Sequence, residues 1–166
     1  KQKLTGEERE YTVEYEHGDT VWFVIDTDTW EKEGKIALLR KFCSQKNSAI
    51  SQEYDEIKEY CAWNVAQSNP CFEVWLYYHF YNTKPQEDDV SKYASFKEYV
   101  NNKISGGFNY EKDPARLEDA IANTNNNFNV KNTGTIILYS SEMYRLGIEI
   151  EGFVKKDVAK LKNKIV

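Results

Sequence analysis

Hydrophobic residues in the first half of the chain form short apolar runs and a helical repeat, separated by polar turns. The run Thr20–Ile25 is apolar on both faces and predicts a buried strand, and residues 63–68 predict a second one. Between them, apolar residues recur near a 3.6-residue period over 32–45, which predicts a helix, and residues 54–60 predict a shorter helix. Strands interleaved with helical segments indicate an α/β fold.

The second half of the chain is predicted to be mainly helical. Asn69 can cap a helix that begins at Pro70, and the apolar side chains of "CFEVWLYYHFY" cover nearly its whole circumference, which indicates a buried helix. Ser95 and Glu98 form a capping-box pattern at the start of another helix, which extends to about Ile104.

Further helices are expected from Asp113 and from Ser141 to the end of the chain. Gly147 and Gly152 weaken the last helix, at roughly 1 kcal/mol each. Polar stretches predict loops at 82–93 and 123–134, and residues 135–139 predict a short strand.

The length of 166 residues suits one domain that spans 1–166, and 40% hydrophobic residues suffice for a core. No run approaches the roughly 18 apolar residues of a membrane span, and the three cysteines form no Cys-x-x-Cys pair. We therefore expect a cytoplasmic protein with reduced thiols that does not bind a membrane. The net charge of -5 argues against binding nucleic acid with the whole surface, although a local basic patch could still bind phosphates.

Two carboxylates, Asp26 and Asp28, follow the first predicted strand in "VWFVIDTDTW". Ligands bind at the carboxyl ends of strands in open α/β sheets, and the alternation of an extended chain turns both side chains to one side. Carboxylate oxygens are the ligands that Mg²⁺ or Mn²⁺ prefers. From these residues alone, an equally good interpretation is that Asp28 caps the next helix and Asp26 is a turn acid.

Three sequence blocks decide between these interpretations: "VWFVIDTDTW", "SNPCFEVWLYYHF", and the weaker pair "NYEKD" and "SSEMYRLG". Together they resemble the RloB-like family of prokaryotic defence proteins, which is related in fold to TOPRIM nucleases. The middle block is the most distinctive, and the resemblance covers about residues 20–150. It implies a TOPRIM-like, mostly parallel sheet flanked by helices.

The resemblance also implies a function, which is phosphodiester cleavage with Mg²⁺ or Mn²⁺ in an anti-phage system that often includes an RloA-type ATPase. Asp26 and Asp28 would be metal ligands and catalytic residues, with Glu73 as a further catalytic acid. Asn69 would lie next to the site as a substrate-binding residue, and Tyr110 and Lys112 would contact phosphates. Nucleic acid is then the expected substrate.

The sequence departs from the family pattern near the amino terminus. The family places a glutamate on a strand well before the Asp-x-Asp motif, and nothing in "KQKLTGEEREYTVEYEHGD" matches it. Either the first strand-helix unit of the domain is missing, which is the alternative we favour, or the chain is catalytically incomplete. Activity depends on whether the full-length chain supplies that glutamate, because two-metal phosphoryl chemistry needs several carboxylates.

Other functions remain open. The chain could be a non-catalytic subunit that binds nucleotides or docks on an ATPase, and "DTDT" also matches the first motif of haloacid-dehalogenase-type phosphatases. His79 has no second histidine at ligand spacing, which favours a hydrogen-bonded core histidine over a catalytic one. Under the nuclease hypothesis, Asp26, Asp28 and Glu73 are expected to lie within reach of one hydrated cation.

Overall fold

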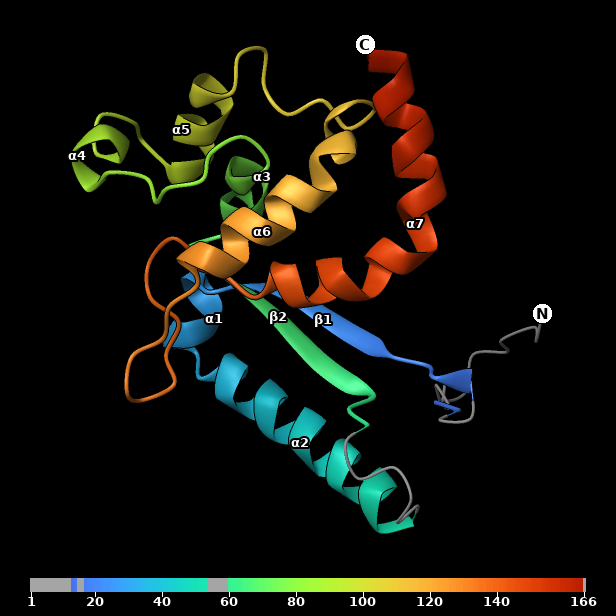
Figure 1. Ribbon diagram of the computed structural model, residues 1–166. Coiled ribbons are helices and arrows are strands. Elements are labelled where there is room, and N and C mark those ends of the chain that lie inside the picture. Colours follow the sequence, from blue (N-terminus) through green and yellow to red (C-terminus); the bar gives the residue numbers. More distant parts are fainter. Residues whose placement is uncertain (1–12, 15–16, 54–59, 166) are drawn as a thin grey trace, which may run out of the picture.

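A small mixed sheet lies between layers of helices in the computed structural model, which describes residues 13–14, 17–53 and 60–165 (Figure 1). Within these residues the sheet has three strands in the order β1 (Val21–Asp26), β2 (Trp63–Asn69) and β3 (Ser140–Ser141). β1 and β2 are parallel, whereas β3 runs antiparallel to β2. The predicted α/β class is confirmed. Of the two strand pairings in the described sheet, only the one between β1 and β2 is parallel.

One face of the sheet is covered by α2 (Lys35–Glu53), which connects β1 to β2 (Figure 1). Its apolar side chains pack on the two strands and form a small core of Ile25, Ile36, Cys43 and Val65. None of the described helices is both long and apolar enough to cross a lipid bilayer.

The prediction of one helix over residues 32–45 is wrong at both ends. A short helix, α1 (Asp28–Lys32), forms directly after β1, and the chain then turns at Gly34, whose φ of 68° favours glycine. α2 continues to Glu53 because its polar residues face solvent and do not interrupt the backbone hydrogen bonds. The helix predicted over 54–60 lies almost wholly outside the described residues.

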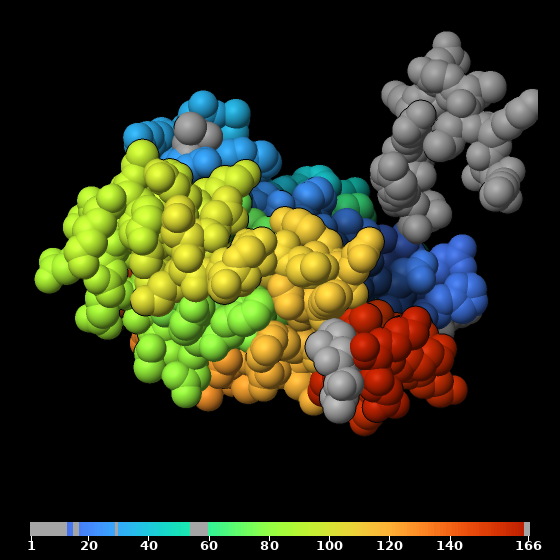
Figure 2. Space-filling model, turned by 90° about the horizontal axis from the view of Figure 1, so that it is seen from above, coloured from blue at the N-terminus to red at the C-terminus, as the bar shows by residue number. Residues whose placement is uncertain are grey.

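The other face carries the larger core, built from α3 (Glu73–Tyr78), α5 (Phe96–Lys103), α6 (Leu117–Asn127) and α7 (Met143–Ile165). Two short elements, α4 (Glu87–Val90) and η3 (Asp113–Arg116), lie in the connections between these helices. Seen from above, the segment that includes α4 and α5 covers one side of this layer and α7 the other, with α6 between them (Figure 2).

The buried helix does not begin at Pro70 as predicted. Asn69 is the last residue of β2, and its side-chain amide donates to the Ile136 carbonyl over 2.8 Å instead of capping a helix. The Pro70 carbonyl accepts a hydrogen bond of 3.1 Å from the Thr27 backbone N–H, so this segment packs on the end of β1. α3 therefore begins three residues later, at Glu73.

Two of the loop and strand predictions also differ from the structure. α6 continues to Asn127 in a stretch predicted as a loop, because the amides of Asn123 and Asn127 donate to the carbonyls of Tyr78 and Asn82, each over 2.9 Å. The strand predicted at 135–139 is wrong, since the residues that pair with β2 are 140–141.

Other predictions are confirmed. The Ser95 hydroxyl accepts from the Glu98 N–H at the start of α5, over 3.1 Å, and α5 ends at Lys103, close to the predicted end. Residues 143–165 form one long helix, α7.

The two glycines of α7 should respond oppositely to substitution by alanine. A Cβ at Gly147 would lie 2.8 Å from Ile121 Cγ1 and 3.1 Å from Trp75 Cη2, whereas a Cβ at Gly152 would meet nothing within 4 Å. We expect Gly152→Ala to stabilise the protein by up to about 1 kcal/mol through helix propensity. Gly147→Ala should be about 1–3 kcal/mol less stable than Gly152→Ala, because overpacking opposes the same gain.

Urea unfolding of both variants measures this difference directly. Equal free energies of unfolding would show that α7 does not pack closely on α3 and α6 at Gly147.

Candidate active site

The Asp-x-Asp motif lies where β1 ends and α1 begins. Asp26 closes the strand and is half-buried, Asp28 opens the helix and is exposed, and Thr27 between them is buried. The Thr27 N–H and hydroxyl both donate to the Ser68 carbonyl over 2.9 Å. Because Thr27 is held inward in this way, the two aspartates lie on the opposite side of the chain and line one hollow.

The third acid, Glu73, lies in the first turn of α3, where β2 has ended and the chain has passed Pro70. Its carboxylate accepts a hydrogen bond from the Cys71 thiol and forms an ion pair with Lys97, with 3.7 Å between Nζ and Oε1. Its side chain is only 17% exposed. The parallel pairing of β1 and β2 thus places α1 and α3, with their acids, at the same end of the sheet.

The charges of Asp28 and Glu73 both act on Asp26. Burial raises the pKa of Asp26, and the charges of Glu73 and Asp28 raise it further, while a hydrogen bond from the Phe72 N–H opposes the rise. Burial also raises the pKa of the Cys71 thiol, as do its hydrogen bond to Glu73 and the nearby carboxylates. Like charges that are partly removed from water favour a bound cation or a proton at this position.

Beside these acids is a hollow of about 600 Å³ along the outer edge of β1. Its apolar walls include Trp22, Val24, Trp30 and Phe72, and the two aspartates lie at its end near α1. The volume is within the range of small-molecule sites, and the wall of aromatic side chains can pack against a flat group.

The donor set suits a hydrated cation, because Mg²⁺ is usually bound through one or two carboxylates and keeps several waters. Asp26 and Asp28 are the residues that could hold it, with Glu73 close by. In the described part of the chain, no group of three or more His, Cys, Asp or Glu side chains is arranged so that it could hold a metal ion. The expectation that the three acids share one hydrated cation therefore stays a prediction.

The other residues that the sequence predicted for the site are Tyr110, Lys112 and Asn69. Tyr110 is 73% exposed and, together with Phe72, lines an apolar groove of about 400 Å³ between α3 and α7. Lys112 is exposed and directly precedes η3. No contact between described residues joins Lys112 to the acids, and the Asn69 amide is engaged with Ile136.

The prediction of a core histidine at position 79 is confirmed. Its Nδ1 lies 2.9 Å from the Trp75 carbonyl oxygen, and its ring packs edge-on against Trp75 and Phe108. Burial lowers the pKa of His79, so the neutral imidazole is favoured.

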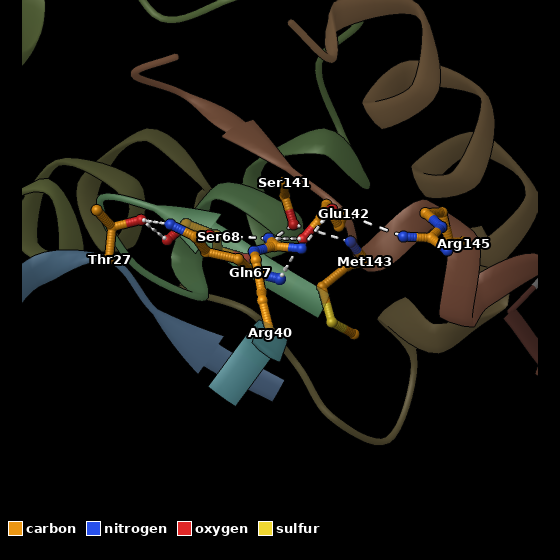
Figure 3. Close-up of polar contacts among 8 residues, drawn as sticks. All are labelled: Thr27, Arg40, Gln67, Ser68, Ser141, Glu142, Met143 and Arg145. Carbon is orange, nitrogen blue, oxygen red and sulfur yellow. Dashed lines mark hydrogen bonds and ion pairs between the residues drawn. The ribbon is translucent and has the colours of Figure 1, made fainter. Parts of the chain in front are cut away.

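A buried polar network holds the strand end behind the aspartates, and its members were not singled out by sequence reasoning (Figure 3). Glu142 is only 7% exposed and accepts hydrogen bonds from Arg40, at 2.6 and 3.4 Å, and from the Gln67 N–H at 3.1 Å. Arg145 adds an ion pair of 3.6 Å on the other side of the carboxylate. The only sequence signal for this role is the position of Glu142 in the block "SSEMYRLG".

The network reaches the Asp-x-Asp motif through Gln67. The Gln67 side-chain carbonyl accepts from Arg40 over 2.9 Å, which leaves its amide to donate to the Thr27 hydroxyl over 2.8 Å. The hydroxyls of Ser68 and Ser141 lie 2.8 Å apart and join β2 to β3 at the same level. Residues from α2, β2 and the start of α7 thus fix Thr27, and Thr27 sets the direction of both aspartates.

Removal of the charge at Asp26 should stabilise the fold at neutral pH. Because the pKa of folded Asp26 lies above its ordinary value of 3.8, the folded state holds this proton more tightly than the unfolded state. The ionised carboxylate therefore destabilises the fold above the folded-state pKa, and this cost disappears as the pH falls below 3.8. We expect Asp26→Asn to raise the Tm by a few degrees at pH 7–8 and the gain to vanish in acid.

Thermal melts of Asp26→Asn and of the control Asp88→Asn, at an exposed acid of α4, between pH 3 and 8 check this expectation. A gain that is independent of pH, or equal for the two variants, would contradict the assignment of a raised pKa to Asp26.

Glu142→Gln should destabilise the protein by about 1–3 kcal/mol, because the variant loses the charge-assisted bonds of a buried carboxylate. The exposed control Glu111→Gln should change the free energy of unfolding by less than about 0.5 kcal/mol. Chemical unfolding measures both values, and a Glu142 variant as stable as the control would show that the network does not support the fold.

Comparison with known proteins supports the resemblance that the sequence blocks indicate. The model of the family described as RloB-like protein matches residues 3–149, which is most of the chain. No curated protein and no solved structure matches it. The match includes Asp26, Asp28, Glu73 and Glu142, and the chain belongs to the RloB-like protein family.

Proposed function

We propose that this chain is the metal-binding part of a TOPRIM-like nuclease that acts in the cytoplasm in prokaryotic anti-phage defence. The observation that carries the proposal is that Asp26 and Asp28 line a hollow at the carboxyl ends of two parallel strands, where the charges of Asp28 and Glu73 raise the pKa of Asp26. Membership of the RloB-like family supports it. Nucleic acid is the proposed substrate, and an RloA-type ATPase is the proposed partner.

The chemistry of the site divides between the metal and the side chains. A bound Mg²⁺ or Mn²⁺ would stabilise negative charge on the phosphoryl group and lower the pKa of a water molecule. Asp26 and Asp28 would hold this cation, and Glu73 would accept a proton or orient a water molecule. Lys97 forms an ion pair with Glu73, and Trp30 and Phe72 line the hollow beside Asp26.

Substrate contacts would lie next to the acids. Phe72 belongs both to the hollow beside Asp26 and to the groove that contains Tyr110, so a strand bound at the acids can continue toward Tyr110. Lys112, two residues further along the chain, is proposed to contact a phosphate there. Asn69 would act indirectly, since its bond to Ile136 holds the end of β2.

A second candidate function is a non-catalytic subunit that binds a nucleotide or docks on an ATPase. It is favoured by one observation, which is that the described residues contain no group of three or more acids, cysteines or histidines that could hold a metal ion. The two functions differ in one measurable property, which is metal-dependent cleavage.

Addition of Mg²⁺ or Mn²⁺ should raise the Tm of the protein, because a cation relieves the repulsion at Asp26. At a concentration about tenfold above Kd the stabilisation would be roughly 1.4 kcal/mol. The double variant Asp26→Asn with Asp28→Asn should lose this response, while the control Glu87→Gln with Asp88→Asn, at two exposed acids of α4, should keep it. A full metal-dependent shift in the first variant would show that cations bind elsewhere.

Cleavage separates the two candidate functions. The full-length protein is incubated with labelled single- and double-stranded DNA and RNA and with Mg²⁺ or Mn²⁺. The nuclease proposal expects cleavage that requires metal and falls at least about 100-fold in the double aspartate variant, which corresponds to about 2.7 kcal/mol. Metal binding without cleavage of any of these substrates would favour the non-catalytic subunit.

A further inference from the structure

On the side away from β1, β2 pairs with β3 only at Ser68 and Asn69. Along the rest of this outer edge, one set of backbone hydrogen-bonding groups has no partner among the residues that the structure describes. The N–H of Val21 donates to the Ala62 carbonyl and that of Thr27 to the Ser68 carbonyl, so even-numbered residues of this segment turn toward β1. Alternation along the strand therefore turns the backbone groups of residues 63, 65 and 67 outward.

Two of these three residues, Trp63 and Gln67, already have hydrogen-bond partners on this side. At Trp63, the Asn47 amide donates to the carbonyl and accepts from the N–H, both over 2.9 Å. At Gln67, the N–H donates to the Glu142 carboxylate and the carbonyl accepts from the Glu142 N–H over 2.8 Å. Among the described residues, none bonds to the outward N–H and carbonyl of Val65.

Because only Val65 lacks partners among the described residues, this edge of β2 can bind a small group more easily than a strand. An added polypeptide strand pairs with alternate residues, and it would have to displace Asn47 and Glu142 to do so. A single planar group with one donor next to one acceptor needs only Val65. The Asn47 amide already shows this geometry at Trp63, one repeat along the same edge.

The space in front of Val65 is a hollow of about 650 Å³ between α2 and the first turn of α7, with polar and apolar side chains in its lining. Its lining includes Arg40, Ser44, Ser48, Asn64 and Arg145. The two arginines share one carboxylate, Glu142, so one positive charge is in excess, and their side chains are 38% and 45% exposed. Arg145 in particular retains N–H donors for an anion.

We infer that this hollow binds a free nucleotide. The base would pair with the N–H and carbonyl of Val65 through its Watson–Crick edge, which carries neighbouring donors and acceptors in every base. The phosphate would bind to Arg145 and Arg40, whose partner Gln67 lies two residues, or about 7 Å, along β2. The volume is within the range of sites for such ligands, and none of these residues is one of the three acids.

Binding of nucleoside monophosphates, measured by calorimetry in metal-free buffer, tests this inference. At least one of AMP, GMP, CMP and UMP should bind, whereas its nucleoside and inorganic phosphate should each bind at least about tenfold more weakly. The double variant Asp26→Asn with Asp28→Asn should bind the same nucleotide unchanged. Nucleotide binding that is lost in this variant would place the ligand at the acids and overturn the inference, independently of any nuclease activity.

Two pairs of variants localise the ligand. Ser44→Trp fills the hollow and should abolish binding, while Gln45→Trp, at an exposed neighbour that does not line it, should not. Arg145→Gln should weaken the monophosphate at least about tenfold and leave the nucleoside unchanged, and exposed Lys156→Gln serves as its control. Arg40 still pairs with Glu142 in the Arg145 variant, so the fold should persist, which circular dichroism verifies.

Three results would overturn the inference. The first is that no monophosphate binds at about 1 mM, which is the weakest affinity of interest. The second is that Ser44→Trp binds as tightly as Gln45→Trp. The third is that a single-stranded oligonucleotide binds more than about tenfold more tightly than every mononucleotide, which would make a nucleic-acid strand the ligand.

Discussion

The buried carboxylate of Glu142 is the constraint on which the arrangement of the sheet depends. A charge removed from water is tolerated only if it is paired and hydrogen-bonded, and Glu142 obtains its partners from three places. Arg40 comes from the helix on one face of the sheet, Gln67 from β2, and Arg145 from the helix on the other face. The two helical layers therefore cannot shift along the sheet without leaving a charge unpaired.

The same network explains why the acids face outward. Gln67 uses one end of its side chain for Arg40 and the other for Thr27, so the Thr27 side chain is held in the interior. Backbone alternation then leaves Asp26 and Asp28 no inward position. Packing behind Asp26 thus keeps its carboxylate near the charges of Asp28 and Glu73, which raise its pKa.

Local patterns predicted the parts of the fold that local physics decides. The strand before Asp26, the cap at Ser95 and the long helix α7 follow from periodicity and side-chain hydrogen bonds within a few residues. The start of α3 did not, because the bond from Thr27 to Pro70 is made by a residue far away in the chain. Asn123 and Asn127 remain helical for a similar reason, since their amides are satisfied by carbonyls outside their own helix.

The site likewise has parts that local sequence predicts and parts that depend on distant residues. The Asp-x-Asp motif carries its own spacing signal, whereas Glu142 resembles any acid near a helix start until its partners are known. Those partners lie 102 and 75 residues away, at Arg40 and Gln67. A ribosome adds about 5–20 residues per second, so β2 is made several seconds before Glu142. During that interval the outer edge of β2 in the nascent chain lacks its Glu142 partner at Gln67 and is open to pairing with neighbouring chains.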